Sequence, residues 1–430
     1  MTPKVKKRIE QIRQGIVPEG YKKGKIGIVP IKWNEVPFST LFTSTSEYTD
    51  DLKQYPLYSL TIEDGITAKT ERYERSHLVK KENSYKVVRP NDYAYNPMNI
   101  RFGAVARHKG DIPVAVSGYY DIFTTVHESD LVFMDSFLTY GPMITYYNKV
   151  STGSLVEKQR VHFSDFLEFS LALPPLEERK KIAEILSTQD KVIELQGRKI
   201  EELKRFKKGC LEKMFPRKGQ KVPEKRFPGF TDDWEQRKLS EMCGTFEYGL
   251  NAAAKEFDGK NKYIRITDID DASREFLLSD LSSPDICLDG MSKYLLSSGD
   301  IIFARTGASV GKTYIYREND GIVYFAGFLI RAKVNQDNDA EFVFQSTLSP
   351  SYEKYIRITS QRSGQPGVNA QEYGEYDLFA PSKEEQQRIG HFLRGIDNLI
   401  TLHQRKLEEM KNQKKALMQL LLTGIVRVRL

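Results

Sequence analysis

The segment "FARTGASVGKTYIY", Phe303 to Tyr316, contains glycine, lysine and threonine in the order used by nucleotide-binding loops. Such a loop needs a glycine, four free positions and then Gly-Lys-Ser/Thr, because successive backbone N–H groups surround the phosphates. Here Thr306 stands where the first glycine belongs, and Gly307 lies too close to Gly311. The segment therefore predicts a glycine-rich turn between two strands, not an ATP site. This turn carries the polar residues Arg305, Thr306, Ser309, Lys312 and Thr313.

The rest of the chain contains no convincing catalytic or metal-binding set. The six histidines are scattered and the three cysteines form no CxxC pair, so neither spacing predicts a metal site. The sequence "NPMN", 96–99, lacks the second proline and the aromatic residue of the Asn-Pro-Pro-aromatic motif of DNA amino-methyltransferases. Pro284-Asp285 has no acidic-x-Lys partner at nuclease spacing. We expect no catalytic residue, no metal and no cofactor bound by this chain.

Composition limits the class of protein and of partner. A chain of 430 residues predicts at least two domains. The 65 Lys and Arg residues exceed the 58 Asp and Glu residues and give a net charge of +7, which allows a polyanionic partner. No apolar run reaches membrane-spanning length and no signal peptide is evident, so a cytoplasmic protein without membrane contact is expected.

A long segment occurs twice without a gap. "PPLEERKKIAEILSTQDKVIELQGRKIEELKRFKKGCLEKMF" begins at Pro174, and "PSKEEQQRIGHFLRGIDNLITLHQRKLEEMKNQKKALMQLLL" begins at Pro381, an offset of 207 residues. Both copies open on proline and have no proline inside, which predicts two long helices, and Ser382 with Glu385 predicts a capping box. At about 1.5 Å per residue each helix would be roughly 60 Å long.

Apolar residues in both copies recur every seven positions, which is typical of a coiled-coil seam. Because both helices belong to one chain, we expect them to pack on each other. Gln189, Gln196 and His403 interrupt the apolar row and could set its register. The predicted seam and partner-docking positions are Leu186, Ile193, Ile200, Leu203, Leu393, Ile400, Leu407 and Met410.

The repeat extends, more weakly, into the region before each helix. "NDYAYNPMNIRFGAVAR", from Asn91, corresponds to "GDIIFARTGASVGKT", from Gly299, and short apolar runs broken by Gly, Asn and Asp predict strands with some helix. "RQGIVPEGYKKGK", near the beginning, resembles "LTGIVRVRL" near the end, so these two segments are expected to lie near each other. The predicted organisation is a first domain 1–173, a helix 174–215, a linker 216–233, a second domain 234–380 and a helix 381–424.

Two similar domains with polar loops suit DNA recognition. Arg and Lys can pair with guanine edges, Asn and Gln with adenine, and hydroxyl groups with phosphates. Two non-identical domains on one helical spacer would read two different half-sites separated by unread base pairs. The DNA-binding candidates are Asn96, Asn99, Arg101, Arg107, Lys158, Arg160, Arg305, Thr306, Ser309, Lys312, Thr313, Arg362, Ser363, Gln365 and Asn369.

With these features the chain resembles the specificity subunits of type I restriction-modification systems. The resemblance is carried by "LPPLEERKKIAEIL" and "APSKEEQQRIGHFL", by "ARTGASVGKTY", and by "SGQPGVNAQEY" from Ser363. Glu385-Gln386 keeps the usual Glu-Gln pair, whereas Glu178-Arg179 departs from it. The first domain also departs, with "NPMNIRFGAVAR" and "STGSLVEKQR" in place of the two loop segments.

The resemblance implies an α+β fold: two mixed α/β target-recognition domains separated by two long helices that form an antiparallel coiled coil with pseudo-twofold symmetry. It also implies double-stranded DNA, two methyltransferase subunits and restriction/translocase subunits as partners. Those partners would use S-adenosylmethionine, ATP and Mg, and this chain would choose the site without catalysis. A stand-alone bipartite DNA-binding regulator is the alternative that the residues leave open.

Overall fold

The computed structural model describes residues 2–69, 84–155, 159–217, 219–361 and 364–428. The chain divides into two compact units. The first unit is Met1–Leu195 together with Leu407–Leu430, and the second unit is Gln196–Lys406. Each unit therefore contains part of each long helix.

The first unit is built on an antiparallel four-stranded sheet in the order β10-β9-β12-β4. A three-stranded sheet, β11-β8-β5, and the pairs β1-β2, β6-β7 and β13-β3 complete its strands. Its helices and strands are α1 Pro3–Arg13, β1 Tyr21–Gly24, β2 Gly27–Pro30, β3 Asn34–Pro37, β4 Phe42–Ser44, β5 Tyr48–Thr49, β6 Tyr58–Thr61, β7 Gly65–Ala68, β8 Tyr85–Val88, β9 Tyr93–Tyr95, β10 Val105–Arg107, β11 Val114–Ser117, β12 Asp121–Thr125, α2 Leu131–Phe137, α3 Gly141–Val150, α4 Phe163–Leu167 and β13 Ser170–Leu173.

The second unit contains a four-stranded antiparallel sheet in the order β15-β22-β19-β20. The same unit also contains two antiparallel strand pairs, β16-β18 and β14-β23, and one parallel pair, β17-β21. Its helices and strands are β14 Glu235–Lys238, α6 Leu239–Met242, β15 Cys243–Tyr248, β16 Ala254–Glu256, β17 Lys262–Ile264, β18 Ser282–Pro284, β19 Ile301–Ala304, β20 Thr313–Ile315, β21 Val323–Phe325, β22 Leu329–Val334, α7 Ala340–Ser346, α8 Pro350–Thr359, α9 Ala370–Gly374 and β23 Asp377–Ala380.

The two four-stranded sheets share one strand order. The first sheet matches the second when β9 corresponds to β19, β10 to β20, β12 to β22 and β4 to β15. The strand that precedes each long helix also pairs in the same way, β13 with β3 and β23 with β14. The internal repeat predicted from the sequence is thus confirmed at the level of the fold.

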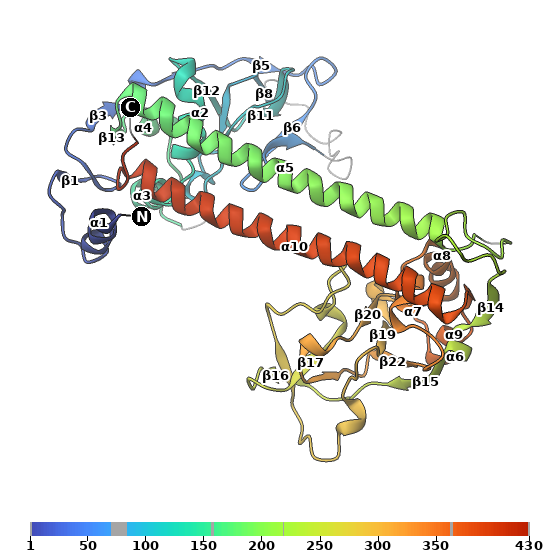
Figure 1. The fold of residues 1–430 in the computed structure, drawn as a ribbon. Helices are drawn as coiled ribbons and strands as arrows, with labels where there is room; N and C mark the ends of the chain where they lie inside the picture. Colours follow the sequence, from blue (N-terminus) through green and yellow to red (C-terminus); the bar gives the residue numbers. More distant parts are fainter. Residues whose placement is uncertain (1, 70–83, 156–158, 218, 362–363, 429–430) are drawn as a thin grey trace. The chain divides into compact units, whose positions relative to one another are not determined.

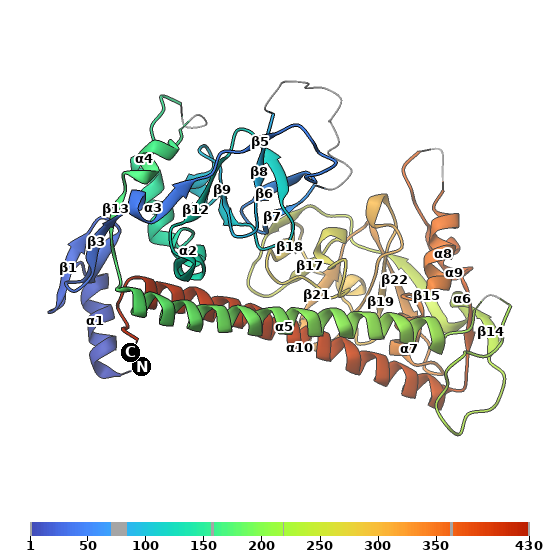
Figure 2. The same cartoon turned by 90° about the horizontal axis from the view of Figure 1, so that it is seen from above.

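The two repeated segments form the long helices α5, Leu176–Met214, and α10, Lys383–Leu422, of 39 and 40 residues. In the first unit the beginning of α5 lies beside the end of α10, which can be followed in Figures 1 and 2. There Gln189 Nε2 donates to the Met410 carbonyl at 3.5 Å and Lys414 pairs with Asp190 at 2.5 Å. The helices therefore run antiparallel in this unit.

The second unit repeats this helix pairing with equivalent residues. Lys207 pairs with Asp397 at 2.6 Å, and both residues lie 207 positions from their counterparts Lys414 and Asp190. Gln196 Nε2 lies 2.8 Å from His403 Nδ1, again at an offset of 207. Of the predicted seam positions, four are buried (Leu186, Ile200, Leu393 and Ile400) and four are half-buried (Ile193, Leu203, Leu407 and Met410).

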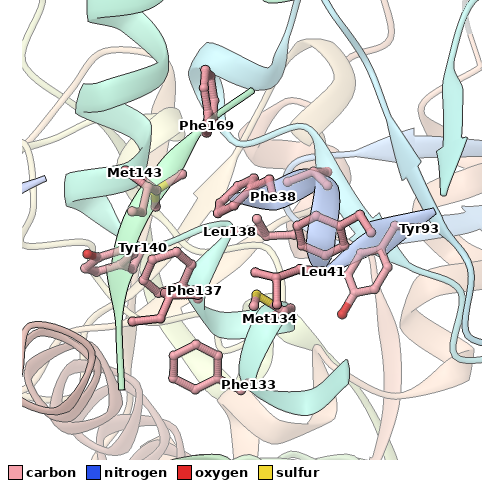
Figure 3. Close-up of a cluster of buried hydrophobic side chains, with 14 of the residues drawn as sticks. Phe38, Leu41, Tyr93, Phe133, Met134, Phe137, Leu138, Tyr140, Met143 and Phe169 are labelled. Atoms are coloured by element: carbon pink, nitrogen blue, oxygen red, sulfur yellow. The ribbon is translucent and has the colours of Figure 1, made fainter. Parts of the chain in front are cut away.

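The core of the first unit is rich in aromatic residues and extends onto the helices. Figure 3 shows side chains from α2, α3 and β9 gathered around Phe38 and Leu41. Ile182 and Leu186 of α5 and Leu421 and Leu422 of α10 belong to the same cluster. Burying these large side chains removes apolar surface from water and fixes the helices to the sheet within the unit.

Each long helix begins with a buried glutamate that is paired with an arginine. Glu178 accepts Trp33 Nε1 at 3.2 Å and Arg427 Nη2 at 2.7 Å. Glu385, at the equivalent position, accepts Arg226 Nε at 2.7 Å and Nη2 at 2.8 Å. We expected Glu385 to form a capping box with Ser382, but its carboxylate is directed to the guanidinium, because a buried charge needs a charged partner.

The departure from Glu-Gln in the first copy has a structural reason. Arg179 is buried and forms a two-point ion pair with buried Asp130, at 2.8 and 3.1 Å. Gln386, at the equivalent position, accepts the backbone N–H of Asp339 at 3.0 Å and donates to Asn338 at 3.3 Å. Both side chains connect the helix to the segment that starts α2 or α7.

The similar segments near the beginning and the end of the chain meet in the first unit, as the sequence predicted. Tyr21 donates its hydroxyl hydrogen to the Gly424 carbonyl at 2.7 Å, and Arg8 donates to the Ile425 carbonyl. Gly424 has φ of +69°, and a Cβ there would lie 2.5 Å from Pro30, so only glycine fits.

Among the described helices, none is long and apolar enough to cross a membrane.

Candidate nucleic-acid interface

The second unit brings together the two loops that the sequence singled out. Thr306, after β19, forms a β-bridge with Gly367, which precedes α9. The Gly307 N–H donates to the Pro366 carbonyl at 3.0 Å, and the Val368 N–H donates to the Arg305 carbonyl at 2.9 Å. Segments about sixty residues apart in sequence thus form one polar surface, which we call the double loop (residues 305–311 and 364–369).

Arg305 lies on the double loop beside two aromatic rings. Its guanidinium carbon is 5.1 Å from the ring centroid of Tyr248, at the end of β15, and 5.9 Å from that of Phe328, just before β22. Both rings are largely exposed, Tyr248 at 45% and Phe328 at 61%. The Tyr248 hydroxyl accepts the Ala370 N–H at 3.3 Å, which ties β15 to the end of the double loop. Cation–π contacts of this kind hold a guanidinium in place.

The acidic residue next to Tyr248 does not compete for Arg305. Glu247 pairs with Arg331, its cross-strand partner on β22, and Arg331 Nε donates to Glu247 at 3.0 Å. This hydrogen bond from Arg331 lowers the pKa of the Glu247 carboxyl below its ordinary value, so Glu247 stays charged and engaged. Among the described residues, no carboxylate forms an ion pair with Arg305.

Two residues predicted to contact DNA lie in the interior instead. Lys312 is 7% exposed, and its ammonium group pairs with Asp271 at 2.5 Å and donates to the Ile269 carbonyl at 3.1 Å. Thr313 is 1% exposed and shares a hydrogen bond of 2.8 Å with Thr347. Both follow Gly311, whose φ of +82° turns the chain inward. We therefore remove Lys312 and Thr313 from the candidate interface and regard them as supports of the loop. A phosphate-binding lysine would need a free ammonium group, which Lys312 lacks.

The other candidates of this loop are exposed or half-buried. Thr306 and Ser309 are half-buried, and Gln365 and Asn369 are exposed. The Asn369 side chain accepts the Glu372 N–H at 2.9 Å and so caps α9. Arg362 and Ser363 lie outside the described residues.

In the first unit, most of the predicted contacts are used inside the fold. Asn96 is buried, and its Oδ1 accepts the N–H groups of Met98 at 3.1 Å and Asn99 at 3.3 Å. The "NPMN" sequence is thus an Asx turn between β9 and β10. Arg101 is 8% exposed and donates to Gln159 at 3.0 Å. We remove Asn96 and Arg101 from the candidate interface because their polar groups face the interior.

Arg107, Asn99 and Arg160 differ in how available they are. Arg107 forms a two-point ion pair with Asp135, with contacts of 3.0 and 2.8 Å, and also donates to Asn91. Asn99 is exposed and Arg160 is half-buried. Lys158 lies outside the described residues. Arg107 lines a hollow of about 680 Å³ together with Lys109, an exposed cation that the sequence did not single out.

Comparison with known proteins places the chain in a family. The model of the type I restriction modification DNA specificity domain matches residues 136–205 and 231–412. The MjaVIII type I restriction enzyme specificity subunit of Methanocaldococcus jannaschii is 28% identical over 275 residues, which span 61% of this chain and 64% of that protein. A protein of the same organism, named as the MjaX specificity subunit, is 23% identical over 98% of this chain and 92% of its own length.

A solved structure supports the fold. The S subunit of a type I restriction-modification system from M. genitalium superposes with a TM-score of 0.56 at 14% identity, covering 93% of this chain and 99% of that one. The duplicated sheet and the paired long helices agree with the family whose model matches the sequence. The chain belongs to the family of type I restriction-modification DNA specificity subunits.

Proposed function

We propose that this chain is the DNA-recognition subunit of a type I restriction-modification complex and that it reads a bipartite, asymmetric target in double-stranded DNA. The observation that carries the proposal is the repeated four-stranded sheet with unlike loops. The β19–β20 loop presents Arg305 beside two exposed aromatic rings, whereas the equivalent β9–β10 loop is closed by an Asx turn. Two similar units with different loops suit two different half-sites.

The candidate contacts of this proposal are now a smaller set than the sequence predicted. In the second unit they are Arg305, Thr306, Ser309, Gln365 and Asn369, together with Arg362 and Ser363. In the first unit they are Asn99, Arg107, Arg160 and Lys158, with the exposed Lys109 added.

The paired helices are proposed to hold the partner subunits. Exposed apolar residues on α5 and α10, such as Leu195, Phe206 and Leu402 at 61%, 55% and 61%, suit protein contact better than DNA contact. Two methyltransferase subunits would bind here and methylate adenine with S-adenosylmethionine. Restriction subunits would join and use ATP and Mg. This chain would itself catalyse no step and would bind none of these cofactors.

Adenine methylation across a host genome tests the proposal. The host expresses the partner methyltransferase with or without this chain, and methylated positions are mapped. A split, asymmetric motif that depends on this chain is the expected result. A complex that co-purifies but adds no methylation would contradict the proposal and favour a stand-alone bipartite regulator, which direct DNA-binding measurements would then reveal.

A further inference from the structure

We propose that Arg305 reads a guanine, and that Phe328 beside it contacts the methyl group of a neighbouring thymine. The half-site read by the second unit would then contain guanine next to thymine. This inference rests on the proposed function and specifies the base chemistry of its second unit.

The first step is the orientation of the guanidinium. The guanidinium carbon lies over the rings of Tyr248 and Phe328, 5.1 and 5.9 Å from their centroids, and these contacts restrict where the group can lie. A planar fork of donors matches the O6 and N7 acceptors of guanine, which is the commonest specific contact in the major groove. Because the two rings already restrict the side chain, it loses less conformational freedom when it binds.

The second step is the availability of those donors. Among the described residues, no carboxylate pairs with Arg305, and neighbouring Glu247 is taken by Arg331. Arg107 of the first unit shows the opposite arrangement, because Asp135 accepts from its guanidinium at two atoms. A buried or paired arginine would need to break its ion pair before reading a base. Among the described residues, Arg305 has no ion pair that would have to break first.

The third step is the exposed ring. Phe328 is 61% exposed, although its backbone is held in place, because its carbonyl accepts the Arg305 N–H at 3.2 Å. This backbone bond brings the two residues next to each other, with the guanidinium carbon 5.9 Å from the ring centroid. In the major groove the apolar group that a base offers is the thymine methyl, which phenylalanine can contact. The pair Arg305–Phe328 therefore fits guanine beside thymine.

Base analogues test the guanine contact in the assembled complex with its methyltransferase. Duplexes carry the motif found by methylation mapping, with each guanine in turn replaced by 7-deazaguanine, which lacks the N7 acceptor. The wild-type complex should lose about 5- to 150-fold in affinity at one guanine of one half-site, the range for one bidentate base contact. Arg305→Ala should show a similar loss on the normal duplex and no further loss at that guanine.

The thymine contact is tested by replacing thymine with uracil, which removes only the methyl group. The wild-type complex should bind more weakly when the thymine beside that guanine is replaced, and Phe328→Ala should be insensitive to the replacement. Ile358→Ala, which truncates a side chain that is 60% exposed on α8, and Arg357→Ala are the matched controls for apolar surface and charge. Unchanged melting temperatures of all variants show that they fold.

The outcomes separate this inference from the function beneath it. If Arg305→Ala weakens every duplex equally and keeps the 7-deazaguanine penalty at every guanine, Arg305 contacts a phosphate and the guanine assignment is overturned. If uracil is tolerated by the wild type at every position of that half-site, the thymine assignment is overturned. If the wild-type complex shows no sequence-specific binding, the proposed function itself is wrong.

Discussion

At the scale of single residues, the interior of this protein depends on charged side chains that are individually matched. Asp130 and Arg179 are 1% and 8% exposed and satisfy each other, and Glu178 and Glu385 each accept from an arginine that follows a long helix. Removing one member leaves a buried charge without a partner, which costs more than the pair contributes. These positions are therefore more sensitive than their distance from the candidate interface suggests.

Replacing Arg179 with glutamine, the residue at the equivalent position of the second helix, tests this view. Arg179→Gln should destabilise the first unit by about 3–5 kcal/mol, because Asp130 stays buried and charged. Denaturant unfolding measures the change. Arg179→Gln combined with Asp130→Asn should recover part of the loss. Lys180→Gln, at an exposed position, should change the stability by less than about 0.5 kcal/mol. Equal effects of Lys180→Gln and Arg179→Gln would contradict the argument.

At the scale of elements, the two long helices act through a narrow row of contacts. Leu393 is fully buried, whereas Leu399, six residues further along α10, is 46% exposed. Both are leucines on the same helix, so their helix propensity is equal and only packing separates them. Packing in the seam should therefore account for any difference in stability between an alanine substitution at Leu393 and one at Leu399.

Leu393→Ala should lower the free energy of unfolding by about 2–5 kcal/mol, because the truncation removes buried methyl groups and leaves a cavity. Leu399→Ala should cost less than about 1 kcal/mol. Chemical denaturation followed by circular dichroism compares the two variants. A loss that is the same for both would mean that the seam is not a packed interface.

Much of this architecture was predictable because it is periodic. The gap-free offset of 207 residues and the seven-residue spacing predicted the helices, their seam and the duplicated design. Side-chain direction in the loops was not predictable, because it depends on strand pairing far away. Thr313 faces the interior because β20 pairs with β19 in the register that sets Phe303 opposite Thr313. Tyr248 and Phe328 gave no sequence signal, since an aromatic residue beside a strand usually belongs to a core.

At the scale of the whole molecule, the compact units do not follow the order of helices and domains along the chain. The first unit needs residues 407–430, including Arg427, whereas the second unit is the continuous segment 196–406 and includes Arg226. Each arginine pairs with the buried glutamate near the start of a long helix, Arg427 in the first unit and Arg226 in the second. They allow the stability of each unit to be altered separately.

Arg427→Ala should weaken the first unit and Arg226→Ala the second, because each leaves a buried glutamate unpaired. Hydrogen exchange resolved along the sequence measures the effect. Protection should fall around Glu178 and Trp33 in the first variant and around Glu385 in the second. Arg13→Ala on α1, which is exposed, is the control. Loss of protection spread equally over both units by either variant would show that they do not behave as separate units.

The division at Lys406 also sets an order of events during synthesis. The ribosome completes the segment 196–406 before it makes the last residues of the first unit. Until Leu421, Leu422 and Arg427 emerge, Ile182 and Leu186 lack part of their apolar cover and Glu178 has no guanidinium beside it. The unit that is begun first is therefore finished last, and its apolar residues Ile182 and Leu186 stay partly uncovered until Leu421 and Leu422 have been made.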